Sequence, residues 1–284
     1  MTKEAPLTSI GISVYGQPLD WLQICIESAL NQTNTNIEVL VRPDGPNAIG
    51  HTEAAWLSNI ASRDRRLRLL EGPRTLGTFG SLRVIFQQAR GDFLVQLDAD
   101  DALHPQAIEL ACAEFEARTG LSMVYTKCLE MDSVGNIIGE GARQNVPYGD
   151  LSILVQFMTF HMRFICRRHY ELVGGYRPDL KFTGDYDLSI RLSEVGGVFF
   201  LPLPLYNYRL HSNNTSRQHY QETVQESYNV ARNALFRRRL AGTYYLRMAS
   251  NNTGVLLKFP SWARKNQHHS GDHIYLSSTC TQWL

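Results

Sequence analysis

Residues 93–101 read FLVQLDADD, an apolar run that leads directly into three carboxylates. The run predicts a buried strand, and in extended backbone Asp98 and Asp100 then point to the same face. Carboxylates this close repel one another unless a cation lies among them, and their oxygens suit Mg²⁺ or Mn²⁺, which also bind substrate phosphates. The alternative is a solvated acidic turn in which Asp101 caps a helix that begins near Pro105.

The chain before this stretch alternates between strand and helix patterns. Strands are expected at 7–15, 37–41 and 67–70, and helices at 18–30, 51–62 and 80–89, the last with Gly91 as its C-terminal cap. Short links between such elements imply right-handed crossovers and a mostly parallel sheet. Ligands bind beyond the carboxyl ends of the strands in sheets of this kind. Ser13, Tyr15 and Asp44 are therefore expected to meet the acidic cluster in one crevice.

The second half of the chain has a less regular pattern. Helices are expected at 105–118, 150–157, 168–173, 188–195 and 218–239, and strands at 122–131, 136–139, 163–166, 198–201 and 205–210. The chain becomes polar and irregular after about Pro260, where we expect poor order. The fold class is thus α/β, with a mostly parallel sheet, a smaller mixed region and a C-terminal helix.

Composition narrows the class of protein. Hydrophobic residues make up 43% and charged residues 19%, which argues against disorder, and a net charge of +1 argues against a nucleic-acid binder. The five cysteines are scattered without a CxxC pair, and no apolar run suits a signal peptide or a spanning helix, so a cytoplasmic location is expected. GxGxxG, GxxxxGK[ST], HExxH and GxSxG are absent, which weakens dinucleotide, P-loop, metalloprotease and hydrolase interpretations.

Several segments together resemble glycosyltransferase family 2 of the GT-A fold. They are 9–46, 91–101, LVGGY at 172–176, GDYDLSIRL at 184–192 and YRLH at 208–211, in that order. The resemblance implies a Rossmann-type sheet flanked by helices. It also implies inverting transfer of a sugar from a nucleotide-diphosphate sugar to an acceptor hydroxyl, with Mg²⁺ or Mn²⁺. UDP is the expected nucleotide, on resemblance alone.

The resemblance also divides the chain. Residues 1–216 are expected to form the glycosyltransferase domain, with a nucleotide-binding half over about 1–103 and an acceptor half over about 104–216. Residues 217–259 would form a helical extension, and 260–284 a poorly ordered tail.

The resemblance assigns roles to the nucleotide side of the site. Ser13, Tyr15 and Asp44 match positions that hold the base and ribose, although Pro43 replaces the first of two acidic residues usual in this turn. Arg83 matches a position that faces the nucleotide, and as a lone helix residue it would otherwise be a solvated surface group.

The acidic cluster and the YRLH motif receive roles in the same way. Asp100 matches the main metal ligand, and His211 a position that completes the metal shell in some relatives. Asp98 is assigned to the ribose or a metal-bound water, and Asp101 to the donor sugar or a helix cap. Arg209 either faces the diphosphate or pairs with a carboxylate.

Asp185 is the expected catalytic base. An acceptor hydroxyl must lose its proton as it attacks the anomeric carbon, and a carboxylate within hydrogen-bond reach can take that proton. The alternative role is capping of the helix that follows. Many relatives have Glu-Asp where this chain has Gly184 and Asp185, so the acidic neighbour is missing. A decayed nucleotide-sugar-binding or scaffolding protein of the same fold is therefore the second hypothesis.

Two basic segments suggest where an acceptor could bind. Residues 217–247 contain six Arg and two Glu, which suits either an anionic membrane surface with lipid-linked acceptors or, as we favour, a helix packed on the domain. His161, Arg163 and 167–169 form a second cluster, which suits an anionic acceptor or, as we favour, a solvated strand edge. Acceptors are thus expected to be saccharides or lipid-linked saccharides in cell-surface polysaccharide or glycolipid synthesis, made in the cytoplasm or at the inner face of the membrane. The oligomeric state is left open.

Overall fold

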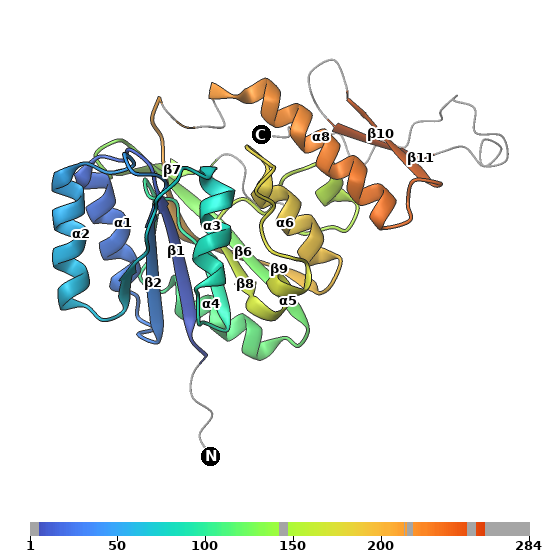
Figure 1. Cartoon of the computed structure of the whole chain (residues 1–284). Helices are drawn as coiled ribbons and strands as arrows, with labels where there is room; N and C mark the ends of the chain where they lie inside the picture. The colour runs from blue at the N-terminus through green and yellow to red at the C-terminus, as the bar shows by residue number, and fades with distance from the viewer. Residues whose placement is uncertain (1–5, 142–146, 213, 215–217, 249–253, 259–284) are drawn as a thin grey trace.

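The computed structural model describes residues 6–141, 147–212, 214, 218–248 and 254–258, so the tail expected at 260–284 lies outside the described residues. A nine-stranded sheet forms the centre of the molecule, in the order β3-β2-β1-β4-β8-β6-β9-β5, with β7 paired to β6 (Figure 1). Its strands are β1 (Thr8–Val14), β2 (Ile37–Pro43), β3 (Leu67–Leu69), β4 (Phe93–Gln96), β5 (Ala102–Leu103), β6 (Leu121–Met131), β7 (Ile137–Glu140), β8 (Arg163–Cys166) and β9 (Gly197–Arg209).

Strand direction decides where the functional side chains gather. Strands β3, β2, β1 and β4 are mutually parallel, and β6 is parallel to β9. Strand β8 runs antiparallel to both β4 and β6, so β4, β6 and β9 all point the same way. The ends of β1, β2, β4 and β9 therefore lie at one edge of the sheet, which also receives the start of β8. The mostly parallel α/β sheet is confirmed.

Helices cover both faces of the sheet (Figure 1). They are α1 (Leu19–Leu30), α2 (His51–Arg63), α3 (Gly77–Gln87), α4 (Ala107–Ala117), α5 (Arg167–Leu172), α6 (Gly184–Ser193) and α8 (Tyr220–Arg237), with a short 3₁₀ turn η1 (Ser152–Leu154). Side chains of α1, α2 and α4 share one core cluster with strand residues such as Ile10 and Val95. Side chains of α3, α5 and α6 share another with Leu40 and Leu94 on the opposite pleat. The alternation of apolar residues along each strand thus supplies both cores.

Helix α8 packs on the molecule through a third cluster. Val224, Val230, Ala231 and Leu235 are buried there with Tyr186 of α6. This packing matches the favoured interpretation of residues 217–247. The hairpin that follows, β10 (Tyr244–Met248) and β11 (Gly254–Lys258), was not predicted from the sequence.

The basic residues at the end of α8 have partners on the domain. Arg237 Nε and Arg238 Nε lie 2.9 and 3.3 Å from the carboxylate of Glu194, at the end of α6. Two of the basic residues in this segment therefore share one carboxylate of the domain. No helix of the described residues is long and apolar enough to span a bilayer.

Two other local predictions were wrong. Helix α6 begins at Gly184 rather than at 188, and its N-cap is Thr183, so Asp185 lies in the first turn and is not the cap. Helix α3 ends at the cap Gln88 rather than at Gly91. Gly91 is required for another reason, because a Cβ there would lie 2.7 Å from the backbone nitrogen of Ser9.

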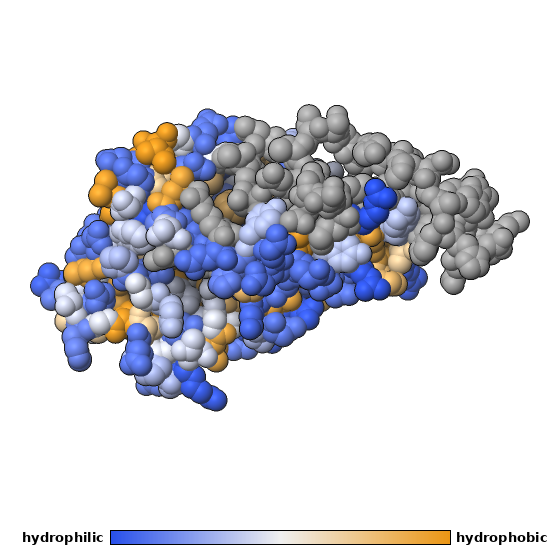
Figure 2. All heavy atoms as spheres, turned by 90° about the horizontal axis from the view of Figure 1, so that it is seen from above, coloured by the Kyte–Doolittle hydropathy of each residue, from blue (hydrophilic) through white to orange (hydrophobic). Residues whose placement is uncertain are grey.

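Figure 2 looks down on the edge where the parallel strands end. The described part of this face is mainly hydrophilic, with apolar side chains in small separate groups. Tyr15 is one exposed aromatic near this edge, with 63% of its surface accessible.

Candidate active site

Asp98, just beyond β4, is a partly buried carboxylate. Its Oδ1 accepts a hydrogen bond of 2.7 Å from Gln96 Nε2. Burial raises the pKa of Asp98 to about 6, and the negative charge of Asp100 adds to the rise, whereas Gln96 and Arg163 oppose it. The cluster thus carries more negative charge than its own surroundings stabilise, which is the condition that favours a bound cation.

Asp101 holds the end of β9 against the acidic turn, which comprises residues 98–101. It is only 1% exposed, and its oxygens accept bonds of 2.7 Å from Tyr206 OH and 2.8 Å from the backbone N–H of Arg209. Burial and the charge of Asp100 raise its pKa well above the usual value. The helix-cap alternative was wrong, because the N-cap of α4 is Gln106.

Asp100 and His211, the two predicted metal ligands, lie in contact. His211 Nε2 is 2.8 Å from Asp100 Oδ2, and the side chains keep 12% and 20% exposure. The ring of Trp21 lies 4.7 Å from that of His211, centroid to centroid. A carboxylate and an imidazole, both reachable from outside, are thus brought together from segments more than a hundred residues apart.

The guanidinium of Arg209 binds backbone carbonyls rather than the carboxylate that was one alternative, and its predicted contact with the diphosphate stays a prediction. Its Nε donates to the carbonyl of Asp100 at 2.6 Å, and its Nη1 to the carbonyls of Asp132 and Ser133 at 3.2 and 3.1 Å. The guanidinium is fully buried, 5.1 Å from the ring of Trp21. Its Nη2 is buried and has no hydrogen-bond partner among the described residues, so one donor beside the acidic turn is unsatisfied.

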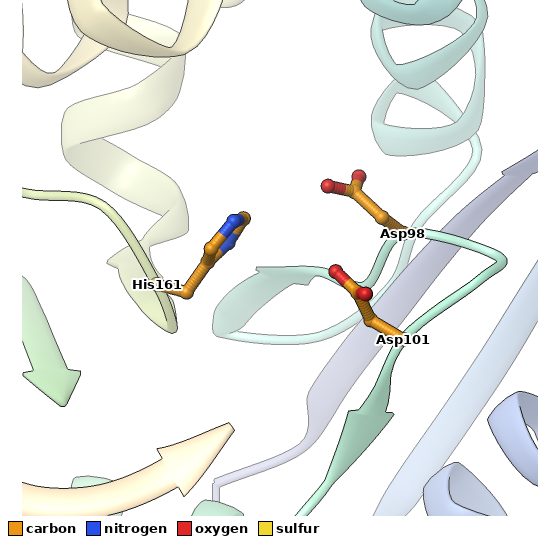
Figure 3. A group of neighbouring side chains, drawn as sticks. All are labelled: Asp98, Asp101 and His161. Carbon is orange, nitrogen blue, oxygen red and sulfur yellow. The ribbon is translucent and has the colours of Figure 1, made fainter. Parts of the chain in front are cut away.

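A second group could also hold a cation. Asp98, Asp101 and His161 have ligand atoms within 4.8 Å of one another, with both carboxylates directed toward the imidazole (Figure 3). His161 is 6% exposed and lies flat on the ring of Tyr206, at 4.4 Å and 4°. Both oxygens of Asp101 already accept hydrogen bonds. Asp100 and His211 are more exposed than Asp101 and His161, and their role as ligands stays a prediction.

Asp185, the predicted base, lies in the first turn of α6. Its Oδ1 accepts a bond of 2.8 Å from the backbone N–H of Tyr186, and its Oδ2 lies 3.2 Å from Arg163 Nη2. The side chain keeps 16% exposure. Burial raises the pKa of Asp185, and the guanidinium of Arg163 partly offsets that rise. A partly buried carboxylate with a raised pKa is a better base than a solvated one.

A chain of polar contacts joins Asp185 to the acidic turn. Arg163 Nη2 also donates to Gln96 Oε1 at 3.3 Å, and Gln96 in turn donates to Asp98. Tyr176 OH donates to the same Gln96 oxygen at 2.6 Å. The solvated strand edge that we favoured was wrong here, because Arg163 and His161 are both buried. Asp185 and the acidic residues 98–101 are therefore linked through Arg163 and Gln96.

Asp44 is enclosed at the end of β2. Its carboxylate accepts bonds from Arg42 Nη1 at 3.0 Å and from the backbone N–H groups of Leu76 and Gly77, both at 2.8 Å. Ser81 Oγ adds another at 3.0 Å. Asp44 thus stabilises the start of α3 next to the strand ends. Its predicted contact with a base or ribose stays a prediction.

The other nucleotide-side residues differ in what holds them. Tyr15 presents an open ring just beyond β1, and the half-buried Ser13 faces Arg42 of β2 in register. Arg83 Nη1 donates to the carbonyls of Gly174 and Tyr176, each at 2.7 Å. Arg83 therefore fixes the turn after α5, and its predicted contact with the nucleotide stays untested.

Several residues of this site were missed from the sequence. Gln96 could have been found, because it lies two positions before Asp98 and so shares its face of the strand. Tyr176 and Tyr206 lie inside apolar stretches and carry no signal beyond a strand or loop aromatic. The position of Arg163 next to Asp185 depends on the pairing of β8 with β4, which the sequence does not reveal.

Comparison with known proteins shows which family the chain resembles in sequence. Residues 9–171, more than half of the chain, match the family described as glycosyl transferase family 2. The chain is similar to a chondroitin synthase of Escherichia coli, with 32% identity over 214 residues that cover 75% of this chain and 30% of that protein. It is also similar to a hyaluronan synthase of Pasteurella multocida, with 31% identity over 74% of this chain and 21% of that protein. The chain thus spans less than a third of the length of these relatives.

Solved structures share the fold at low identity. The crystal structure of S. aureus TarS 1-349 in complex with UDP-GlcNAc has a TM-score of 0.62 and 15% identity, covering 81% of this chain and 66% of that one. The mannosyltransferase PcManGT from Pyrobaculum calidifontis, in complex with GDP-Man and Mn²⁺, has a TM-score of 0.60 and 13% identity, covering 85% and 77%. The GT-A-like fold expected from the sequence is confirmed.

Proposed function

The chain belongs to glycosyl transferase family 2, and from this premise we propose that it transfers a sugar from a nucleotide-diphosphate sugar to an acceptor hydroxyl, with inversion at the anomeric carbon. The observation that carries the proposal is the run of contacts from Asp98 through Gln96 and Arg163 to Asp185. It joins a cation-favouring acidic turn to a carboxylate that can act as a base.

The leaving group is assigned to the acidic turn and the end of β9. The unpartnered Nη2 of Arg209 can donate to a diphosphate oxygen, and the open ring of Tyr15 offers a stacking surface for the nucleobase. Asp100 and His211 fit a divalent cation, because their carboxylate and imidazole are in contact and partly exposed. When bound, such an ion would neutralise charge that develops on the departing diphosphate.

Asp185 is assigned to deprotonation of the acceptor. Its raised pKa improves its basicity, and the guanidinium of Arg163 favours its ionised form and so limits that rise. Attack by the deprotonated oxygen on the face opposite the diphosphate forms the new glycosidic bond and breaks the bond to the leaving group. The anomeric configuration is thereby inverted.

UDP is the proposed nucleotide and Mn²⁺ or Mg²⁺ the proposed ion. TarS, a neighbour in fold, holds UDP-GlcNAc, while PcManGT holds GDP-Man and Mn²⁺. Relatives named chondroitin synthase and hyaluronan synthase suggest a saccharide acceptor and a role in polysaccharide or glycolipid synthesis. A lipid-linked acceptor, and with it a position at the inner face of the membrane, belongs to the same proposal.

Release of UDP from UDP-sugars, measured with and without Mn²⁺ across a panel of saccharide acceptors, tests this function. GDP-mannose serves as the competing donor. Acceptor-dependent release of UDP that needs the ion and is lost in Asp185→Asn supports the proposal. Binding of UDP-sugars without turnover on any acceptor would contradict it and favour a non-catalytic binding protein.

A further inference from the structure

The pair Gly184–Asp185 lacks the acidic residue that often precedes the base in this family, and the structure gives the reason. A Cβ at position 184 would lie 2.4 Å from Cγ of Phe79, a ring atom of a side chain anchored in α3. Any side chain at 184 would therefore displace a core aromatic. The space beside the base on this side is taken by packing rather than by a carboxylate.

A carboxylate reaches the same segment from elsewhere in the chain. Glu226, on α8, accepts hydrogen bonds from the consecutive backbone N–H groups of Lys181, Phe182 and Thr183, at 3.1, 2.8 and 2.8 Å. The hydroxyl of Thr183 donates a further bond of 2.9 Å to the same side chain. Thr183 is the N-cap of α6, so Glu226 holds the residues that lead directly into the turn that carries Asp185.

The contact is specific to this position on α8. Glu222, one turn earlier on the helix, is exposed and lies 3.8 Å from His219 instead. The ring of His219, the N-cap of α8, stacks on Phe182 at 4.9 Å, so the two segments also touch through their side chains. Figure 1 shows α6 and α8 side by side, and the two helices share a buried cluster.

From this geometry we propose that Glu226 is a positioning residue for the base Asp185, supplied by α8 in place of the missing neighbour at 184. The inference rests on the proposed function. A carboxylate that accepts several N–H groups at the start of a helix is stabilised by the helix dipole and fixes the backbone there. The orientation of Asp185 toward an acceptor thus depends on a helix that lies beyond the family-matched residues 9–171.

Glu226 also affects the charge at the base. Its negative charge raises the pKa of Asp185. Removal of that charge should lower the pKa, so the acidic limb of the profile of kcat/KM against pH should move to lower pH. A residue that only stabilised the fold would leave this limb in place.

The variants Glu226→Gln and Glu226→Asp test the proposal, with Glu222→Gln as the matched control on the same helix. In Glu226→Gln we expect kcat for transfer to fall about tenfold with little change in KM for the donor, since small misplacement of a reacting group is costly. The acidic limb should move to lower pH. Glu226→Asp, which retains the charge, should keep the limb in place even where the shorter side chain lowers kcat. Glu222→Gln should match the wild type.

The rate of hydrogen–deuterium exchange of the amides at 181–183 is a measurement that does not depend on enzymatic activity. Exchange there should be faster in Glu226→Gln and unchanged in Glu222→Gln. Faster exchange together with wild-type kcat and pH profile would overturn the positioning role while leaving the proposed function intact. Unchanged exchange would overturn the contact itself. If the wild type transfers no sugar, the proposed function fails first, and Glu226 is then only a structural group.

Discussion

The two sides of the candidate site are built in different ways. The acid side comprises Asp98, Asp100, Asp101, Arg209 and His211, which come from two short motifs at the ends of β4 and β9. The base side comprises Asp185 with Gln96, Arg163, Tyr176 and Glu226, which come from separate segments.

The difference shows what each part of the chemistry requires. Cation binding needs several ligands close together, and a strand end followed by a tight turn provides them locally. A base needs one carboxylate with a tuned pKa, and the tuning comes from whatever packs around it. Changes on the acid side should therefore alter ion dependence, and changes on the base side should alter the pH profile.

The largest effect is expected for Asp185→Asn, which removes the base and leaves the acid side intact. Transfer should fall by about 10²–10⁴-fold, the usual contribution of a general base. The rise in Tm on addition of UDP-sugar and Mn²⁺ should persist. Asp179→Asn, which changes an exposed carboxylate on the preceding loop, is the control. Loss of donor binding in Asp185→Asn would mean that the two sides do not act separately.

Asp100→Asn should have the next largest effect and should act through the ion. Loss of several kcal/mol of charge stabilisation corresponds to about 10²–10³-fold in rate. Affinity for Mn²⁺, measured by calorimetry with UDP present, should fall in parallel, whereas Asp20→Asn on the exposed part of α1 should behave as wild type. If His161→Gln abolishes Mn²⁺ binding and Asp100→Asn does not, the ion lies in the buried group instead.

Arg163→Met should change the pH dependence of the base side. Arg163 lowers the pKa of Asp185, so its removal should raise that pKa, and the acidic limb of kcat/KM should move to higher pH. The shift is opposite in sign to that expected for Glu226→Gln. Arg163 is buried, so a loss of stability of about 3–5 kcal/mol is also expected, and Tm should be measured alongside. If the acidic limb stays in place in a folded variant, Arg163 does not affect the pKa of Asp185.

Gly184→Ala should have the smallest effect. It tests whether Phe79 is the reason that Asp185 has no acidic neighbour at position 184. The added Cβ would collide with Phe79, so the free energy of unfolding should fall by about 1–3 kcal/mol. The double variant with Phe79→Leu should recover part of this loss in a double-mutant cycle. Additive effects of the two changes would show that Phe79 does not restrict position 184.

The two sides also differ in how well they could be predicted. The pairing of Asp100 with His211 was expected from the family resemblance, which assigned both to the metal, and the structure places the two side chains in contact. The exposure of Arg163 was misjudged, because an arginine in a short strand gives no sign that a partly buried carboxylate lies next to it. Glu226 resembles any helix surface residue in the sequence, and only the packing of α8 against α6 brings it to Thr183.

The helices and strands were also predicted to different extents along the chain. Strand and helix positions in the first hundred residues followed from apolar periodicity. The early start of α6 and the hairpin β10–β11 did not, because GDYD carries no apolar periodicity and YYLRM alternates too weakly to separate a strand from the end of a helix.

A crystal structure of the protein with Mn²⁺ and an unreactive UDP-sugar analogue tests most directly whether the two sides form one site. We predict the ion on Asp100 and His211, the diphosphate within reach of Arg209 Nη2, and the open face of the anomeric carbon toward Asp185. An ion bound by His161 and Asp101, or an anomeric carbon directed away from Asp185, would contradict this prediction.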